Sequence, residues 1–96
     1  MRVVQIVRME AAPGKAAQLL VLLQQGRDFT LKVDGCEAFD VYQAKDDPHQ
    51  LLMVERWASV EAHQTHFEKN VKATGLLDRC VALMREPPQL AYYLPR

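Results

Sequence analysis

Two histidines, a carboxylate and the chain's only tryptophan lie between positions 55 and 66, and side chains of these types can move a proton on an aromatic ligand. Glu55 and Trp57 are two residues apart, so they share one face if this segment is a strand. His63 and His66 are three residues apart, so they share one side if that segment is a helix. A histidine titrates near neutral pH and is the usual general base, and a carboxylate can orient it. The pattern predicts a proton-transfer site where a strand ends and a helix begins.

The strands and helices that would hold these residues follow from the spacing of apolar positions. Ser59 suits the N-cap of the helix that carries both histidines, and Pro87-Pro88 ends the helical pattern that follows. Gly35 is expected to end the first helix in the left-handed conformation. Asp46-Asp47-Pro48 predicts the turn of a hairpin, and the element order is β-α-β-β-α-β. The predicted strands are 3–9, 36–44, 50–58 and 89–94, the first helix is 15–33, and the second helical region runs from 60 to 84 with a break at 70–75.

This order predicts an α+β fold of the ferredoxin-like type, in which a four-stranded antiparallel sheet carries its helices on one face. A chain of 96 residues supports one core, so residues 1–96 are expected to form a single domain. Both faces of the sheet are apolar, since Leu51 and Met53 alternate with Leu52 and Val54 along the third strand. The face without helices needs an apolar cover. We expect a second copy of the chain to supply it in a two-fold homodimer.

Charge and length argue against several classes of partner. Lys and Arg number 12, Asp and Glu number 12, and no basic stripe is present, which argues against nucleic-acid binding. No apolar run reaches the ~18 residues of a membrane span. The apolar run after Met1 is too short to be typical of a signal peptide, so we expect a cytoplasmic protein. Cys36 and Cys80 are far apart and are expected to be reduced, buried side chains.

Several segments of the chain occur in the same order in a known family. They are Gly14-Lys15-Ala16, Gly35-Cys36, Phe39 to Gln43, Asp46-Asp47-Pro48, Glu55-Arg56-Trp57 and Glu61-Ala62 to His66. Together they make nearly the whole chain resemble the antibiotic biosynthesis monooxygenase domain family, and within it the quinol-monooxygenase-like members. The resemblance implies a dimeric α+β barrel of ferredoxin-like subunits. It also implies chemistry, because some members oxidise a quinol or a polycyclic phenol with O2 and use no flavin, haem or metal cofactor.

In such a reaction a base removes a phenolic proton and the anion then reduces O2, which suggests roles for particular residues. His66 stands where the family usually has histidine and is the expected catalytic base, oriented by the carboxylate of Glu55. Arg56 or a protonated His63 would stabilise the developing oxyanion. The residues expected to form an apolar slot for a flat substrate are Trp57, Phe39, Phe67, Met53 and Leu20, and those that could donate to a substrate oxygen are Tyr42, Tyr92 and Tyr93.

The sequence also allows purely structural roles for the candidate site residues and functions other than that of a monooxygenase. Trp57 is more often a core or interface residue than a substrate contact, and relatives usually carry an aliphatic residue in place of His63, which favours a packed histidine. A zinc site of the two histidines and Glu55 lacks the four-residue spacing of helical zinc pairs. Members that degrade haem need an asparagine on the first strand and a tryptophan on the helix after the third, and this chain has neither. The alternatives to a monooxygenase are a non-catalytic small-molecule-binding dimer and an isomerase.

Overall fold

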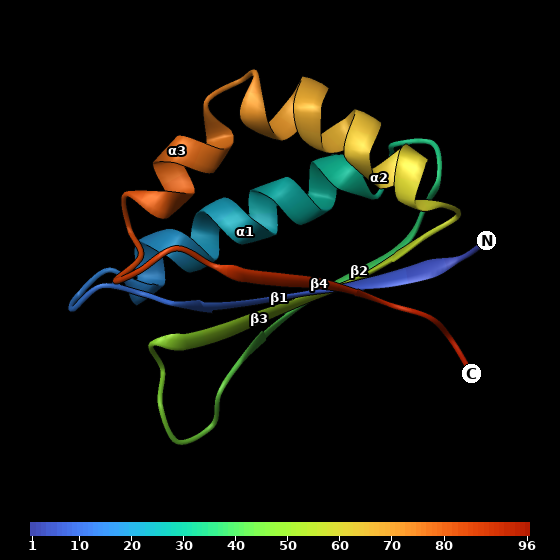
Figure 1. Cartoon of the computed structure of the whole chain (residues 1–96). Helices are drawn as coiled ribbons and strands as arrows, with labels where there is room; N and C mark the ends of the chain where they lie inside the picture. Colours follow the sequence, from blue (N-terminus) through green and yellow to red (C-terminus); the bar gives the residue numbers. More distant parts are fainter.

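The computed structural model describes all residues, 1–96, and its elements follow the predicted order (Figure 1). The second helical region is divided, because an α-helix passes directly into a π-helical turn and a separate short helix begins after Gly75. The first helix ends earlier than predicted, at Thr30. The elements are β1 (Val3–Glu10), α1 (Ala16–Thr30), β2 (Cys36–Gln43), β3 (Gln50–Trp57), α2 (Val60–His66), η1 (Phe67–Lys72), α3 (Leu76–Val81) and β4 (Gln89–Tyr93).

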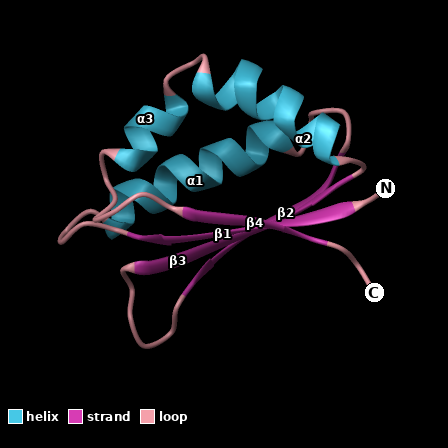
Figure 2. Ribbon diagram, in the orientation of Figure 1, coloured by secondary structure: helices cyan, strands magenta, loops and turns pink.

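One antiparallel sheet with the strand order β2-β3-β1-β4 forms one layer, and all the helices cover the same face of it (Figures 1 and 2). The central strands β1 and β3 pair along their whole length, from Val3 with Trp57 to Glu10 with Gln50. The strands β2 and β4 form the two edges. This is the ferredoxin-like α+β fold, and the predicted fold class is confirmed.

The two faces of the sheet differ in burial. On β1 the odd-numbered residues from Val3 to Met9 are buried under the helices, whereas the residues between them are half-buried or exposed. The buried members of the main core cluster are Val7, Met9, Ala11, Leu19, Leu23, Leu51 and Cys80. The half-buried aliphatic residues of the helix-free face are Val4, Ile6, Leu52 and Val54. The predicted apolar second face is therefore present, with no helix over it.

Two local features set the position of the helix that carries both histidines. The Ser59 hydroxyl accepts a hydrogen bond from the Ala62 backbone N–H at 3.1 Å, which confirms the predicted N-cap. Gly35 has a φ of +92°, and a Cβ atom there would lie 2.7 Å from the Cβ of Ala62. Only glycine fits both that backbone conformation and that close approach. The prediction that Gly35 ends the first helix is wrong, because α1 ends at Thr30. Gly35 instead lets α2 pack closely against the chain just before β2.

Both cysteines are free thiols. Cys80 is a buried member of the core cluster, and Cys36 is half-buried at the start of β2. Burial raises the pKa of both thiols, to about 11 for Cys36, so both are protonated at neutral pH. A protonated, buried thiol packs as a small apolar group and is a poor nucleophile.

None of the helices combines the length and the apolar content that crossing a membrane requires.

Candidate functional site

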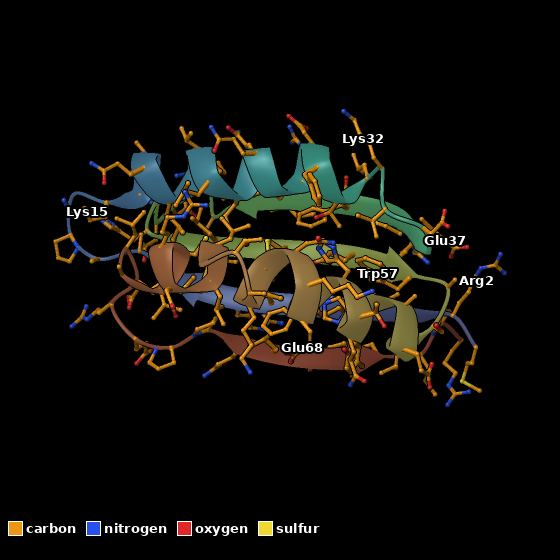
Figure 3. All side chains as sticks on the ribbon, turned by 90° about the horizontal axis from the view of Figure 1, so that it is seen from above. Arg2, Lys15, Lys32, Glu37, Trp57 and Glu68 are labelled. Carbon is orange, nitrogen blue, oxygen red and sulfur yellow. The ribbon has the colours of Figure 1, made fainter.

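A cavity of about 100 Å³ lies between the helices and the covered face of the sheet. Figure 3 looks down on the helices, with Lys15 at the start of α1 and Trp57 near the opposite end of that helix. Most side chains that line the cavity are apolar. The polar ones are Gln5, Thr30, Glu55, His63 and His66. The predicted junction of strand and helix therefore supplies most of the polar lining of this cavity.

Glu55 is a buried carboxyl group with one oxygen bonded and the other free. The residue is 4% exposed, and Oε1 accepts a hydrogen bond from Trp57 Nε1 at 2.9 Å. Oε2 has no protein partner, and no fully enclosed polar side-chain atom in the chain lacks a hydrogen bond, so Oε2 opens onto the cavity. Burial raises the pKa of Glu55 to about 7, although the Trp57 hydrogen bond works against the rise. A carboxyl group with this pKa can accept and return a proton near neutral pH.

His63 is a buried, neutral imidazole held by a tyrosine from the edge strand. Its Nδ1 lies 2.6 Å from the Tyr92 hydroxyl oxygen, and its ring meets Trp57 edge-on at 5.3 Å. Burial, with a smaller contribution from His66, lowers the pKa of His63 to about 4. His63 is therefore uncharged at pH 7, which corrects the expectation that a protonated His63 stabilises an oxyanion. Its Nε2 has no protein partner and opens onto the cavity.

His66 has both ring nitrogens engaged by neighbours other than Glu55. Thr30 Oγ1 lies 3.2 Å from Nε2, and the side-chain nitrogen of Asn70 lies 3.0 Å from Nδ1. An amide N–H donates, so Nδ1 accepts and Nε2 carries the proton that Thr30 accepts. Burial also lowers the pKa of His66. The prediction that Glu55 orients His66 is wrong. The carboxylate is bonded to Trp57 instead, and Asn70 reaches the imidazole from the next helical turn.

One level of the sheet carries a row of inward side chains. From β2 across to β4 they are Phe39, Glu55, Gln5 and Tyr92. Gln5 is 4% exposed and makes no side-chain hydrogen bond to the protein, so its amide faces the cavity. Gln5 is not among the predicted site residues, although it is the one polar residue in the buried alternation of β1. Thr30 is not among them either, because its contact with α2 depends on how the helices pack.

The predicted aromatic residues of the site have different positions. Phe39 and Phe67 line the cavity. Trp57 does not, because its side chain is fully buried next to Glu55, where it packs and donates its hydrogen bond. Tyr42 is 53% exposed and lies on the helix-free face, paired with Leu52. Its predicted role at the substrate is therefore wrong for this cavity.

Arg56 also points away from the cavity. It is exposed and lies between Glu55 and Trp57 on β3, and successive strand residues face opposite sides. The predicted role of Arg56 in stabilising an oxyanion therefore does not hold for this cavity. Leu20, predicted for the apolar slot, packs against the core cluster and does not line the cavity, whereas Met53 does line it. No three His, Cys, Asp or Glu side chains come close enough together to hold a metal ion.

The sequence matches the model of one protein family, described as Antibiotic biosynthesis monooxygenase, over residues 2–71. The matched part includes Glu55, Trp57 and both histidines of the site, and it ends before β4 with Tyr92. No relative is detectable among curated proteins.

Many solved structures share the fold of this chain. The Mycobacterium tuberculosis protein Rv0793 is 24% identical with a TM-score of 0.88, and the alignment covers 100% of this chain and 96% of that one. A conserved protein from Methanosarcina mazei Go1 is 19% identical with a TM-score of 0.90, covering 100% and 94%. A proposed antibiotic biosynthesis monooxygenase from Nitrosomonas europaea is 21% identical with a TM-score of 0.89, covering 98% and 89%. At these identities the similarity establishes the fold alone.

Proposed function

The chain belongs to the antibiotic biosynthesis monooxygenase family, and from that membership and the cavity we propose that it oxidises a single-ring quinol or related phenol with O2, without a bound cofactor. In the proposed reaction a dihydroxybenzene and O2 become a hydroxyquinone and water, so one oxygen atom enters the product and the other leaves as water. The substrate supplies the electrons, because its anion reduces O2, and the ring peroxide that forms loses water to leave a new carbonyl group. The protein must supply a base, an apolar enclosure and a hydrogen-bond donor for the oxyanion.

The observation that carries this proposal is the carboxyl group of Glu55, which has one oxygen bonded to Trp57 and the other free in an apolar cavity. With a pKa raised to about 7, Glu55 is a stronger base than an ordinary carboxylate, and about half of it is still ionised at neutral pH. His66 was the predicted base, but its lone pair is engaged by Asn70 and burial lowers its pKa. We therefore assign the base to Glu55 and assign His66 the task of joining α1 to the second helical region.

The size of the cavity limits a ligand to one ring at most. Its volume of about 100 Å³ is smaller than the ~150 Å³ of an engineered apolar cavity that holds benzene in another protein, so even a single ring needs the cavity walls to move slightly. A polycyclic phenol would need the helices to move. The apolar walls, among them Phe39 and Phe67, would keep water from the reacting anion and so strengthen the hydrogen bonds made to it.

His63 is the proposed donor to the oxyanion. The Tyr92 hydroxyl oxygen lies 2.6 Å from His63 Nδ1. In the proposal this hydroxyl group donates to Nδ1, which leaves the ring proton on Nε2, facing the cavity. A neutral imidazole N–H in this arrangement can stabilise negative charge on a substrate oxygen.

A homodimer is part of the proposal. On the helix-free face Ile6 is the register partner of Val54, and Val4 and Leu52 flank this pair. Tyr42 and Tyr93 extend the same face at the two edges of the sheet and are 53% and 49% exposed. An apolar face of this kind is unusual at the surface of a monomer and is covered most simply by a second copy in a two-fold arrangement.

Oxygen uptake by purified protein, shown by metal analysis and visible spectrum to hold no metal, flavin or haem, tests the function. We expect uptake with a panel of dihydroxybenzenes, incorporation of one atom of ¹⁸O2 per product and no release of peroxide. Glu55→Gln should lower the rate by about 10² to 10⁴, whereas the exposed Glu86→Gln should not change it. A full rate in Glu55→Gln, or no uptake with any phenol, overturns the proposal. Conversion of a ligand without O2 would point to an isomerase, and binding without conversion to a non-catalytic binding protein.

A further inference from the structure

The polar side chains of the cavity lie together at one of its ends. Glu55 and Gln5 are direct register partners on β3 and β1. His63 and His66 both pack against the ring of Trp57, at 5.3 and 5.4 Å between centroids, and Trp57 in turn bonds to Glu55. Thr30 joins the group through its hydrogen bond to His66.

The other end of the cavity has no side chain that donates or accepts a conventional hydrogen bond. Two residues farther along the central strands the inward positions are Val7 and Met53, about 7 Å from Gln5 and Glu55. Beyond them the apolar lining continues. It consists of Met9, Leu22, Leu23, Leu76, Cys80 and Met84. An oxygen atom of a ligand placed in this part would lose its hydrogen bonds to water and gain none.

The free polar atoms at the first end suit a pair of oxygen atoms rather than one. Glu55 Oε2 and the Gln5 amide are adjacent in the sheet, and neither makes a hydrogen bond to the protein. The carboxylate can accept from one hydroxyl group, and the amide can accept from or donate to its neighbour. His63 Nε2 faces the same space from the helix side.

The same end of the cavity leads to the surface. A groove of about 390 Å³ beside β4 shares Gln5, His63, Phe67 and Leu90 with the cavity, and Glu68 also lines it. Figure 3 shows Glu68 next to β4. A ligand that enters by this groove with its apolar edge first carries its oxygen atoms in last, so they come to rest beside the polar residues near the opening.

From this one-ended polarity we propose that the cavity binds a single aromatic ring with two adjacent oxygen atoms on one edge and hydrogen or a short alkyl group on the opposite edge, a catechol-type ring rather than a para-quinol. A para-quinol with one hydroxyl group on Glu55 would put the other among Val7 and Met53. The inference rests on the proposed function for its oxygen chemistry, but the binding preference can be measured without turnover.

Titration calorimetry under nitrogen, with 4-methylcatechol, methylhydroquinone and 4-methylphenol, tests this preference. We expect the catechol to bind at least about tenfold more tightly than either of the others, because each of those leaves one buried polar group unpaired. In Gln5→Leu the advantage of the catechol over 4-methylphenol should largely disappear, because the catechol loses the partner of its second hydroxyl group and 4-methylphenol no longer buries an unpaired amide. Gln18→Leu, on the exposed side of α1, is the matched control and should keep the wild-type ranking.

Equal or tighter binding of methylhydroquinone overturns the inference, as does failure of all three ligands to bind or a Gln5→Leu variant that keeps the catechol preference. Circular dichroism and thermal unfolding check that the variant is folded, and if it is not, the wild-type ranking decides alone. The two proposals can fail separately. Preferred catechol binding without oxygen uptake leaves this inference standing and removes the proposed function, whereas oxygen uptake with para-quinols only does the reverse.

Discussion

The indole Nε1 of Trp57 donates a hydrogen bond to Glu55 Oε1 at 2.9 Å, and the two residues are neighbours on the covered face of β3. The bond fixes one carboxyl oxygen and leaves the other toward the cavity. It gives the lone tryptophan a task that does not require contact with a ligand. Because burial outweighs this bond, the pKa of Glu55 still lies above its ordinary value.

The pH dependence of oxygen uptake should report the ionisation of Glu55. The carboxylate is the active form, so kcat/KM is expected to rise with pH, to reach half its maximum near pH 7 and to level off about one pH unit higher, where Glu55 is ionised. Trp57→Phe removes a donor that favours the carboxylate, so it should move this rise to higher pH. A profile recorded between pH 5 and 9 for both proteins checks the direction. A profile that does not move would show that the base lies elsewhere.

The free energy of unfolding should also depend on pH, in a direction that the raised pKa of Glu55 determines. The pKa of Glu55 is raised from 4.5 to about 7 on folding, so the folded state binds more protons between these pH values. The contribution of Glu55 to the free energy of unfolding is full below pH 4.5 and is lost as the pH rises through 7, a change of about 3 kcal/mol. The side chain introduced by Glu55→Gln cannot ionise, so over the same pH range the free energy of unfolding of this variant should rise by that amount relative to the wild type.

Urea unfolding at pH 4.5 and pH 7.5 measures this difference. His63 contributes in the opposite sense, because its pKa is lowered by burial, but it is present in both proteins and cancels in the comparison. A difference between the two proteins that stays constant with pH would mean that Glu55 titrates normally in the folded state.

His66 should matter more for stability than for the rate. His66→Ala breaks its contacts with Thr30 and Asn70 and is expected to lower the free energy of unfolding by about 1 to 3 kcal/mol. Oxygen uptake by the folded variant should fall less than about tenfold, far less than in Glu55→Gln. His49→Ala, in the turn between β2 and β3, serves as the control for both measurements. A loss of rate equal to that of Glu55→Gln would return the role of base to His66.

The fold could be predicted because its signals are local. The two-residue repeat of a strand places Glu55 on the same side of β3 as Trp57 and Arg56 on the other, and Glu55 and Trp57 are indeed buried while Arg56 is exposed. Ser59 begins α2 as its position before the helical pattern indicates. The end of α1 was misplaced because Gly35 serves the packing of α2 rather than the first helix, a reason that lies in another part of the chain.

The site could be predicted only in part, because its bonds join residues that are far apart in sequence. Thr30 comes from α1 and Tyr92 from β4, and no spacing around the histidines indicates either one. The π-helical turn that follows His66 also changes the periodicity of the second helical region, so a regular helical repeat does not describe which side chains beyond it face the cavity. The spacing of Glu55, Trp57 and the histidines therefore predicts the cluster, but it does not indicate the hydrogen-bond partners that decide which residue can act as a base.

Disruption of the helix-free face should separate the proposed dimer. Val54→Lys puts a charge at the centre of that face beside Ile6, where its burial in an interface would be costly. We expect the wild-type protein to sediment as a dimer and the variant to sediment largely as a monomer at micromolar concentration. Val21→Lys, at an exposed position of α1, is the control and should remain dimeric. A wild-type monomer would contradict the proposed assembly.

The role proposed for His63 depends on which nitrogen carries its proton, and the two neighbouring tyrosines of β4 allow a matched test. Tyr92 contacts His63, while Tyr93 points to the opposite face of the sheet. In wild-type protein, ¹⁵N NMR should show Nε2 protonated and Nδ1 accepting a hydrogen bond. Tyr92→Phe should shift the Nδ1 resonance and raise the pKa of His63, because a bond that only the neutral ring can accept is lost. It should also lower kcat about tenfold, whereas Tyr93→Phe changes none of these. A proton found on Nδ1 in wild type would make Nε2 an acceptor, and His63 could not then stabilise an oxyanion.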